Sequence, residues 1–392
     1  MNQKLLIISS YPLETAGVCT QVRWLATMLK KNTTIEFSIL CSMRKWPIND
    51  SLSGGTTILK SPKVRKYHWM NIPILICLKK YKGVNGTGLS LYDVIPSIAN
   101  NFSSAIIAGG SLALGIGLCQ TQLPYIAWIA TTFESENKIK TPFSFRKMAK
   151  KLRYLYNHKK LILQEQQVLA QCQFTYAISN FTKNAILENN TQYNYKIETL
   201  PIPPTTILTK TSTAPVIGRI ISAGRFTDPR KDIKTMLKAF LIVNKLNPMT
   251  SLVIAGEQPT IPIKHLITKL NLGKSISFIG KVPNIIDEYK KADVMIVSSL
   301  QEGLCLSALE AMNCKVPIVS TRCGGIEDFV INNKTGLLVS IGNEKEMAAA
   351  ILKIITDRSF RNKLGNQGAE LVQKNYNPEN IFKQINNHIQ QL

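Results

Sequence analysis

The chain has few of the side chains that bind metals and form disulfides. Its 392 residues include only 4 histidines, and none of its 8 cysteines forms a Cys-x-x-Cys pair. Zinc sites and redox dithiols need closely spaced Cys and His residues. Most of the cysteines lie in apolar runs, as buried thiols do. We therefore expect no zinc and a reducing compartment.

Acidic side chains are also scarce. The chain has 24 Asp and Glu against 48 Lys and Arg, a net charge of +24, and it contains no Asp-x-Asp motif. A basic excess of this size attracts nucleotides, nucleic acids or an acidic membrane surface. No RNP, KH or zinc-finger signature is present, so we expect no nucleic-acid partner.

No apolar run is long enough to predict a membrane span. The apolar stretch from Lys4 to Ser9 is too short for a signal peptide and is typical of a first buried strand. Residues 101–133 carry no charge, but glycines and Gln120–Pro124 interrupt them. A spanning helix needs ~20 largely uninterrupted apolar residues. We expect strand, short helix and strand here.

Short β-branched runs alternate with longer amphipathic segments, which predicts βα units around parallel sheets. A long helix is expected at about 145–170, and Ser179 is a candidate cap for the next one. Eleven strands are predicted, at Leu5–Ser9, Glu36–Leu40, Ser104–Ala108, Tyr125–Ala130, Phe174–Ile178, Lys196–Leu200, Gly218–Ala223, Ser251–Ala255, Ser275–Ile279, Val294–Val297 and Val316–Ser320.

The length suits two domains, since one domain usually takes ~150 residues. Pro201-Ile-Pro-Pro204 opens a Thr-, Ser- and Pro-containing stretch that continues to Pro215. We predict domains at 1–204 and 216–375 with a linker at 205–215. In the second domain, helices are expected around 231–246, 262–271, 283–290, 306–313 and 325–331, and three more between Glu344 and Leu392. Ligands of two such domains bind at the carboxyl ends of the strands.

The segment from Ser222 to Asp232 combines a strand end with cations. Gly224 ends the strand, and Arg225, Arg230 and Lys231 precede the next helix. Glycine lets a ligand approach the backbone, and a helix N-terminus with nearby cations suits a diphosphate. A turn with solvated charges is the alternative.

Two further segments follow predicted strands. Glu302 precedes a helix that carries Glu310, where the second carboxylate can accept hydrogen bonds from a vicinal diol such as ribose. Backbone N–H groups at 303–307 can face a phosphate. The segment from Pro317 to Asp328 is a strand, a Gly-Gly turn and an acidic helical turn. Alternatively, these are surface glutamates and a tight turn.

Together the three segments resemble glycosyltransferase family 4 (group 1), retaining nucleotide-sugar glycosyltransferases of the GT-B fold. The resemblance is strongest from Ile217 to Val339, and Glu302 and Glu310 form its Glu-x7-Glu pattern. It implies an α/β GT-B architecture, two Rossmann-like doubly wound domains that face each other across a cleft. It also implies that the C-terminal helix, residues 376–392, returns to the N-terminal domain.

The resemblance also implies roles for individual residues. Arg225 and Lys231 would grip the donor diphosphate, and Glu302 would orient the donor sugar. Glu310 would hold the ribose hydroxyls. The remaining donor contacts would come from Gly17, Gly224, Val282, Gly303, Leu304 and Leu306.

Two departures from the family pattern concern the donor sugar. The family often has two glycines where this chain has Ala16-Gly17. Many members also place a His after the strand that corresponds to 125–130, and this chain has none there. Thr131, Thr132 or Glu134 would take over that contact.

The implied activity is metal-independent, because Arg225 and Lys231 can supply the charge that a divalent ion supplies elsewhere; no cofactor is expected. The substrate would be a nucleotide-diphosphate sugar. Its hexose-type sugar would move, with retention of configuration, to a glycolipid, lipopolysaccharide or other cell-envelope glycan acceptor. The alternatives are a catalytically silent GT-B sugar-binding or scaffolding module, and a GT-B enzyme of different chemistry.

Two basic segments with interspersed apolar residues lie in the first half, Leu59–Gly83 and Lys138–Lys160; the second holds nine Lys and Arg and no acid. Each could be a solvated face. Two such segments in one domain favour an anionic membrane surface, where each cation contributes ~1 kcal/mol. We expect a cytoplasmic protein, peripheral on the inner face of the cytoplasmic membrane.

Overall fold

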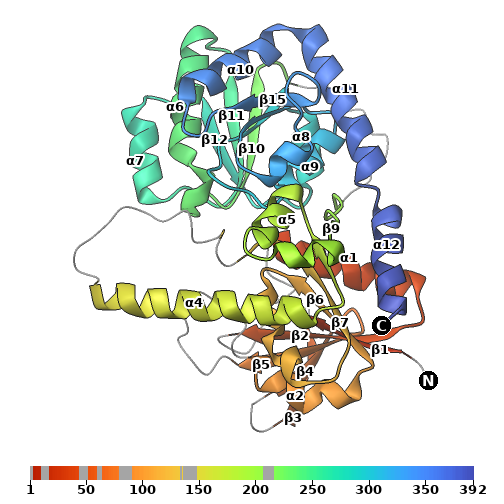
Figure 1. Cartoon of the computed structure of the whole chain (residues 1–392). Helices are drawn as coiled ribbons and strands as arrows, with labels where there is room; N and C mark the ends of the chain where they lie inside the picture. Colours follow the sequence, from red (N-terminus) through yellow and green to blue (C-terminus); the bar gives the residue numbers. More distant parts are fainter. Residues whose placement is uncertain are drawn as a thin grey trace. The chain divides into compact units, whose positions relative to one another are not determined.

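The computed structural model describes residues 3–9, 17–43, 52–59, 64–78, 91–132, 135, 148–205 and 216–392. The chain folds as two compact units (Figure 1). Unit 1 comprises Met1–Pro201 and Glu379–Leu392, and unit 2 comprises Ile202–Pro378. Of the predicted linker, only Thr205 lies within the described residues.

Unit 1 is built on a nine-stranded sheet in the order β3-β4-β5-β2-β1-β6-β7-β8-β9. Every neighbouring pair from β5 to β9 is parallel, whereas β3, β4 and β5 pair antiparallel. The strands are β1 (Lys4–Ile8), β2 (Glu36–Met43), β3 (Ser53–Leu59), β4 (Val64–Trp69), β5 (Ile72–Leu78), β6 (Ser104–Gly109), β7 (Tyr125–Ile129), β8 (Phe174–Ala177) and β9 (Ile197–Thr199).

The helices of unit 1 are α1 (Gly17–Asn32), α2 (Val94–Ile98), η3 (Ala99–Asn101), η4 (Leu112–Gln120), α4 (Met148–Gln171), α5 (Asn180–Leu187), η6 (Thr191–Lys196) and α12 (Pro378–Gln390). Ser179 caps α5, as predicted, by accepting a hydrogen bond from the Thr182 N–H. No described helix is both long and apolar enough to cross a membrane.

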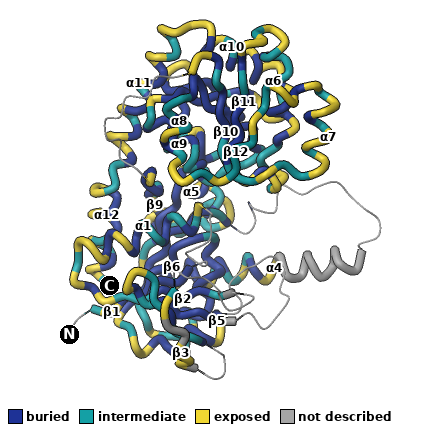
Figure 2. The backbone as a smooth tube through the Cα atoms, turned by 180° about the vertical axis from the view of Figure 1, so that it is seen from behind, coloured by how far each residue is buried: buried dark blue, intermediate teal, exposed yellow. Residues whose placement is uncertain are grey.

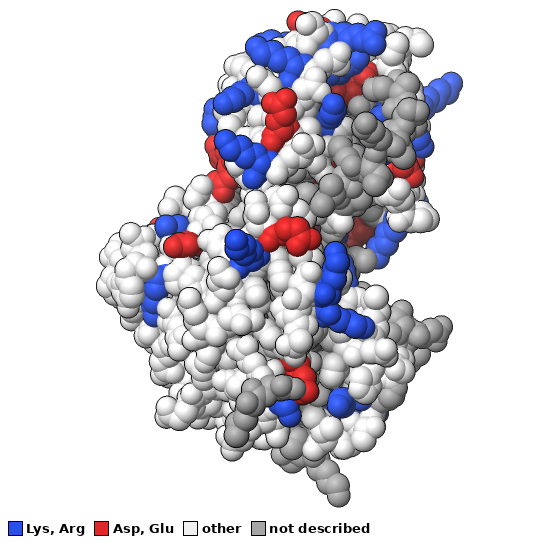
Figure 3. Space-filling model, turned by 90° about the vertical axis from the view of Figure 1, so that its right-hand side faces the viewer, with Lys and Arg blue, Asp and Glu red and all other residues white. Residues whose placement is uncertain are grey.

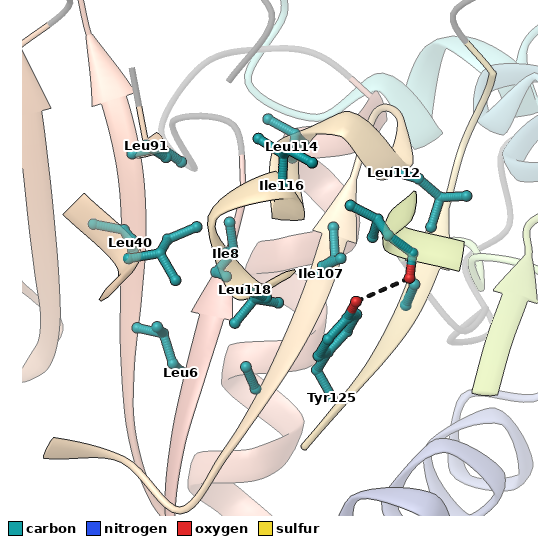
Figure 4. Packing of buried hydrophobic residues seen from close by; sticks show 14 of the residues in the cluster. Leu6, Ile8, Leu40, Leu91, Ile107, Leu112, Leu114, Ile116, Leu118 and Tyr125 are labelled. Atoms are coloured by element: carbon teal, nitrogen blue, oxygen red, sulfur yellow. Dashed lines mark hydrogen bonds between the residues drawn. The ribbon is translucent and has the colours of Figure 1, made fainter. Parts of the chain in front are cut away.

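The uncharged stretch forms β6, the short helix η4 and β7, as predicted. Figure 4 shows η4 residues packed over buried strand residues of the sheet. The Tyr125 hydroxyl donates a hydrogen bond to the Val168 carbonyl oxygen at 2.9 Å, which joins β7 to α4. The stretch is therefore part of the core of unit 1.

The structure corrects the interpretation of Leu59–Gly83. Ile72, Ile74 and Ile76 are buried in β5, which pairs with the central strand β2. A near-continuous apolar run is typical of a strand covered on both faces. These side chains are core and not part of a membrane-facing surface. Lys60, Lys63 and 79–83 lie outside the described residues.

The C-terminal helix α12 packs on unit 1, as predicted. His388 Nδ1 lies 2.5 Å from the Tyr176 hydroxyl of β8, and its ring stacks on Phe174. Near the other end of α12, Phe382 contacts the edge of Trp24 from α1.

Unit 2 has a six-stranded, entirely parallel sheet in the order β12-β11-β10-β13-β14-β15. Its strands are β10 (Arg219–Gly224), β11 (Ser251–Gly256), β12 (Ile276–Gly280), β13 (Val294–Val297), β14 (Ile318–Thr321) and β15 (Gly336–Val339). Its helices are η7 (Pro229–Lys231), α6 (Ile233–Leu246), α7 (Ile261–Lys269), α8 (Ile285–Lys290), α9 (Leu306–Asn313), η8 (Gly325–Asp328), α10 (Glu344–Thr356) and α11 (Arg358–Asn375).

Figure 2 shows the inner strands of unit 2 as mostly buried and the outer helices as partly exposed, while the edge strand β12 is only partly buried. The predicted helix at 325–331 is only the 3-10 turn η8, and β15 was not predicted. From β10 the chain proceeds to one half of the sheet, and from β13 to the other half. In open parallel sheets, ligands bind at the carboxyl ends of strands where the direction of winding changes.

Candidate functional site

The loop after β10 folds back, so that the Lys231 side chain lies beside the end of β10. Asp228 accepts a hydrogen bond from the Arg230 N–H at 3.0 Å and pairs with the Arg230 guanidinium at 2.7 Å. Asp232 then takes a left-handed backbone conformation, φ 40°, and caps α6. A Cβ added to Gly224 would lie 3.5 Å from Cε of Lys231. The lysine side chain therefore lies directly over the glycine.

Lys231 forms an ion pair with Glu302. Its Nζ donates to Glu302 Oε1 at 2.6 Å, and the Ser299 hydroxyl donates to the same oxygen at 2.6 Å. The two charged side chains are only 20% and 12% exposed. Burial by itself lowers the pKa of the Lys231 ammonium, but the Glu302 carboxylate outweighs it and holds that pKa above its ordinary value. The lysine thus stays cationic.

Backbone contacts join the loop after β13 to the loop after β10. The Leu300 N–H donates to the Arg230 carbonyl oxygen at 2.7 Å, and the Ser298 hydroxyl donates to that of Lys231 at 2.8 Å. The third predicted segment joins them, because the Glu302 N–H donates to the Cys323 carbonyl oxygen at 2.6 Å. All three segments meet at one edge of the sheet.

Gly303, Leu304 and Leu306 lead into α9 from Glu302. Leu304 is buried, and Cys305, in the left-handed region at φ 67°, begins the helix. The Ser307 hydroxyl donates to the carbonyl oxygen of Ala223, which ties the first turn of α9 to the end of β10. The N-terminus of α9 therefore lies beside the end of β10, where its free N–H groups favour an anion.

Glu310 lies on α9, and its carboxylate bonds to Thr205. The Thr205 hydroxyl donates to Glu310 Oε1 at 2.5 Å. Burial raises the pKa of Glu310, and hydrogen bonds from Thr205 partly oppose that rise.

Arg225 and Val282 lie in the loops after β10 and β12. Arg225 is exposed and Val282 is half-buried. Near Arg225, Glu257 accepts hydrogen bonds from the Thr227 hydroxyl at 2.5 Å and the Thr227 N–H at 3.1 Å, which lower the pKa of Glu257.

Sequence reasoning missed Ser299, Ser307, Thr205 and Glu257. Ser299 was the most accessible to prediction, because a polar pair, Ser298-Ser299, directly follows a buried strand.

At the carboxyl edge of unit 1, those sequence-predicted residues that the structure describes carry no charge. Gly17 is the first residue of α1. The hydroxyls of Thr131 and Ser135 lie 3.0 Å apart, and the Ser135 N–H donates to the Thr132 hydroxyl at 3.1 Å. Thr132 is buried in this turn and Thr131 is half-buried. Ala16 and Glu134 lie outside the described residues.

Within the part of the chain that the structure describes, no three His, Cys, Asp or Glu side chains gather as a metal site would require.

Most of unit 2 is similar to a known family of proteins. Residues 218–371 match the family model described as Glycosyl transferases group 1. The chain is 28% identical over 156 residues to N-acetyl-alpha-D-glucosaminyl L-malate synthase of Bacillus anthracis, covering 39% of this chain and 40% of that protein. It is 30% identical over 168 residues to the lipopolysaccharide core biosynthesis glycosyltransferase LpsE of Rhizobium meliloti, covering 43% and 47%.

The chain thus matches less than half the length of these curated relatives. The fold likeness extends further. The chain is similar in fold to the solved structure of Anabaena HepE in complex with UDP and glucose. The superposition covers 100% of both chains, with a TM-score of 0.75 and 15% sequence identity. The predicted GT-B fold, two Rossmann-like α/β domains, is confirmed. The matches also support a transferase enzyme.

Proposed function

We propose that the protein is a retaining, metal-independent glycosyltransferase. It moves a hexose-type sugar from a nucleotide-diphosphate donor to a glycolipid, lipopolysaccharide or other cell-envelope glycan acceptor. The observation that carries this proposal is the buried ion pair of Lys231 and Glu302 at the carboxyl ends of β10 and β13, beside Gly224 and the start of α9. Relatives named as glycosyltransferases match this unit, which supports the same activity here.

The geometry suits a leaving diphosphate. Lys231 is held cationic, the exposed Arg225 lies on the same loop, and the N-terminus of α9 adds partial positive charge. As the bond between the sugar C1 and the phosphate oxygen breaks, negative charge grows on that oxygen. A well-placed donor stabilises such charge by ~3–4 kcal/mol.

The bond changes balance without a further reactant. The acceptor oxygen bonds to C1 on the face that the nucleoside diphosphate leaves, so configuration is retained. The acceptor proton passes to the departing phosphate oxygen. Glu302 holds Lys231 in place before the donor arrives and orients a sugar hydroxyl afterwards, since a carboxylate accepts several hydrogen bonds. Glu310 accepts from the ribose hydroxyls.

Membrane attachment belongs to the same proposal, at the inner face of the cytoplasmic membrane. It rests on Lys138–Lys160, which carries nine Lys and Arg and no acid. Of this segment, residues 138–147 lie outside the described residues.

Release of free nucleoside diphosphate tests the reaction. The full-length protein is incubated with UDP-, GDP- and ADP-sugars and extracted envelope glycolipid, and the product's anomeric configuration is read by NMR. We expect one donor to be consumed, with retention, at an undiminished rate in EDTA. Glu302→Ala reduces turnover steeply, while Glu370→Ala, on the exposed face of α11, leaves it unchanged. Full activity of Glu302→Ala, or inversion, contradicts the proposal.

A further inference from the structure

Thr205 donates to the carboxylate of Glu310, the residue that the proposed function assigns to the donor ribose. Its hydroxyl donates to Glu310 Oε1 at 2.5 Å, and its backbone forms a second hydrogen bond to the same side chain. The residue follows Pro201-Ile-Pro-Pro204, where the fixed φ of proline restricts the backbone before it.

These two donors copy the pattern of a ribose. A ribose presents two hydroxyls on adjacent carbons, and Thr205 presents a hydroxyl and an N–H that are separated by two carbons. Both pairs suit a single carboxylate, which accepts through two oxygens. Hydrogen bonds to an ionised acceptor are shorter and stronger than neutral ones. The Glu310 carboxylate therefore already accepts hydrogen bonds from within the chain.

Glu310 needs such a partner. It is half-buried, and this burial raises its pKa, so that an ionised carboxylate without hydrogen bonds is costly there. A donor nucleotide consequently does not meet a free carboxylate and must exchange its hydroxyls for the bonds of Thr205.

We propose that Thr205 is an internal competitor of the donor ribose, which holds Glu310 until a nucleotide replaces it. This inference rests on the proposed function. It assigns a role to the first residue of the predicted linker and makes donor affinity the difference between two sets of hydrogen bonds on one carboxylate.

Calorimetry on the full-length protein tests the exchange. The probes are whichever of UDP, GDP and ADP binds most tightly and its 2′,3′-dideoxy analogue. Thr205→Val removes the hydroxyl and keeps the shape. One hydrogen bond of this kind contributes ~0.5–1.5 kcal/mol net, so we expect the variant to bind the ribonucleotide ~2–12-fold more tightly. The dideoxy analogue lacks the competing hydroxyls, so its affinity does not change.

Two further variants help to distinguish failure of the proposed competition from failure of the proposed function. Thr205→Ser keeps both donors and retains the natural affinity, and Glu310→Gln loses the distinction between the two probes. If Thr205→Val binds the ribonucleotide equally or less tightly, the competition is overturned and the proposed function stands. If no nucleoside diphosphate binds the natural sequence, the proposed function is overturned and the competition with it.

Discussion

The carboxyl edges of the two sheets differ in charge. In unit 2, Lys231 and Glu302 pair across the ends of β10 and β13, with Glu310 and Arg225 near them. In unit 1, the described residues just after β6, β7 and β8, at 110–112, 130–132 and 178–180, are all uncharged. Two units that are both built on largely parallel sheets thus present different chemistry at the carboxyl ends of their strands, ionic in unit 2 and hydroxyl-bearing in unit 1.

Unit 2 contains a second ion pair with a buried carboxylate, away from this edge. Arg361 of α11 pairs at 2.6 Å with Asp293, whose side chain is fully buried at the start of β13 and also accepts from the Gly218 N–H. Figure 3 shows many basic and fewer acidic side chains over the visible face of unit 2. In unit 1, Lys196 is also buried, and its Nζ donates to the carbonyl oxygens of Ala170 and Cys172.

Loss of the lysine at the ionic edge should have the largest effect. Lys231→Ala removes the cation nearest the leaving diphosphate, and we expect kcat to fall ~10²–10³-fold, as when one charge-stabilising donor is deleted. Lys234→Ala, at an exposed lysine that is the second residue of α6, is the matched control and should retain full activity. Circular dichroism of both variants serves as the control for folding. Equal activity of Lys231→Ala and Lys234→Ala would contradict the special role that we assign to the charged edge of unit 2.

Removal of one partner from the buried pair should unfold unit 2 first. Arg361→Met leaves Asp293 buried and charged, which costs ~3–5 kcal/mol. Hydrogen exchange followed by mass spectrometry should show protection lost in 216–378 and retained in β1, β6 and β7. Asp293→Asn with Arg361→Met recovers part of the stability. Uniform loss across both units would contradict the separate stability that we assign to them.

A methyl group at Gly224 should weaken donor binding without harming the fold. The added Cβ meets only the Lys231 side chain, at ordinary contact distance, but it fills space that a pyrophosphate needs. Overpacking of this kind costs ~1–3 kcal/mol, so nucleotide affinity should fall ~5–100-fold by calorimetry. Gly273→Ala, where nothing lies within 4 Å of the new Cβ, should bind normally.

Substitution at the edge of unit 1 should have a smaller effect. Thr131→Val removes one neutral hydroxyl, worth ~0.5–1.5 kcal/mol, so KM for the sugar nucleotide should rise ~2–12-fold with little change for the free nucleoside diphosphate. Thr57→Val, on the exposed strand β3, is the control. A loss as large as that of Lys231→Ala would show that both edges carry the chemistry equally.

The smallest expected effect concerns stability and pH. Burial raises the pKa of Glu310 in the folded protein, so the ionised carboxylate costs stability once pH exceeds the ordinary carboxyl range. Glu310→Gln removes this cost and should raise the melting temperature at pH 7 by ~1–3 °C. The difference should shrink toward zero as the pH falls and Glu310 takes up its proton. A variant that is less stable at pH 7 would contradict this.

The sequence predicted unit 2 better than unit 1 for a physical reason. In unit 2, glycine and charge follow each buried strand closely, so local patterns identify the edge where the loops meet. In unit 1, β4 carries Arg65 and Lys66, and the uncharged, apolar β5 follows it closely. This mixture favoured a surface interpretation, whereas the pairing of β5 with the distant strand β2 decides its burial.

Contacts between distant residues could not be predicted from local patterns. The hydrogen bond from Thr205 to Glu310 and the ion pair of Arg361 with Asp293 join residues that are far apart in the chain. The residues next to Glu310 and Asp293 in the sequence do not indicate these partners. The roles of all the predicted site residues, Lys231, Glu302 and Glu310 included, stay predictions.

A crystal structure of the full-length protein with its nucleoside diphosphate tests the central claim most directly. We predict a phosphate oxygen within hydrogen-bond distance of Lys231 Nζ, and ribose hydroxyls on Glu310 in place of Thr205. A nucleotide bound away from the ends of β10 and β13, with the bonds of Lys231 and Thr205 unchanged, would contradict the account.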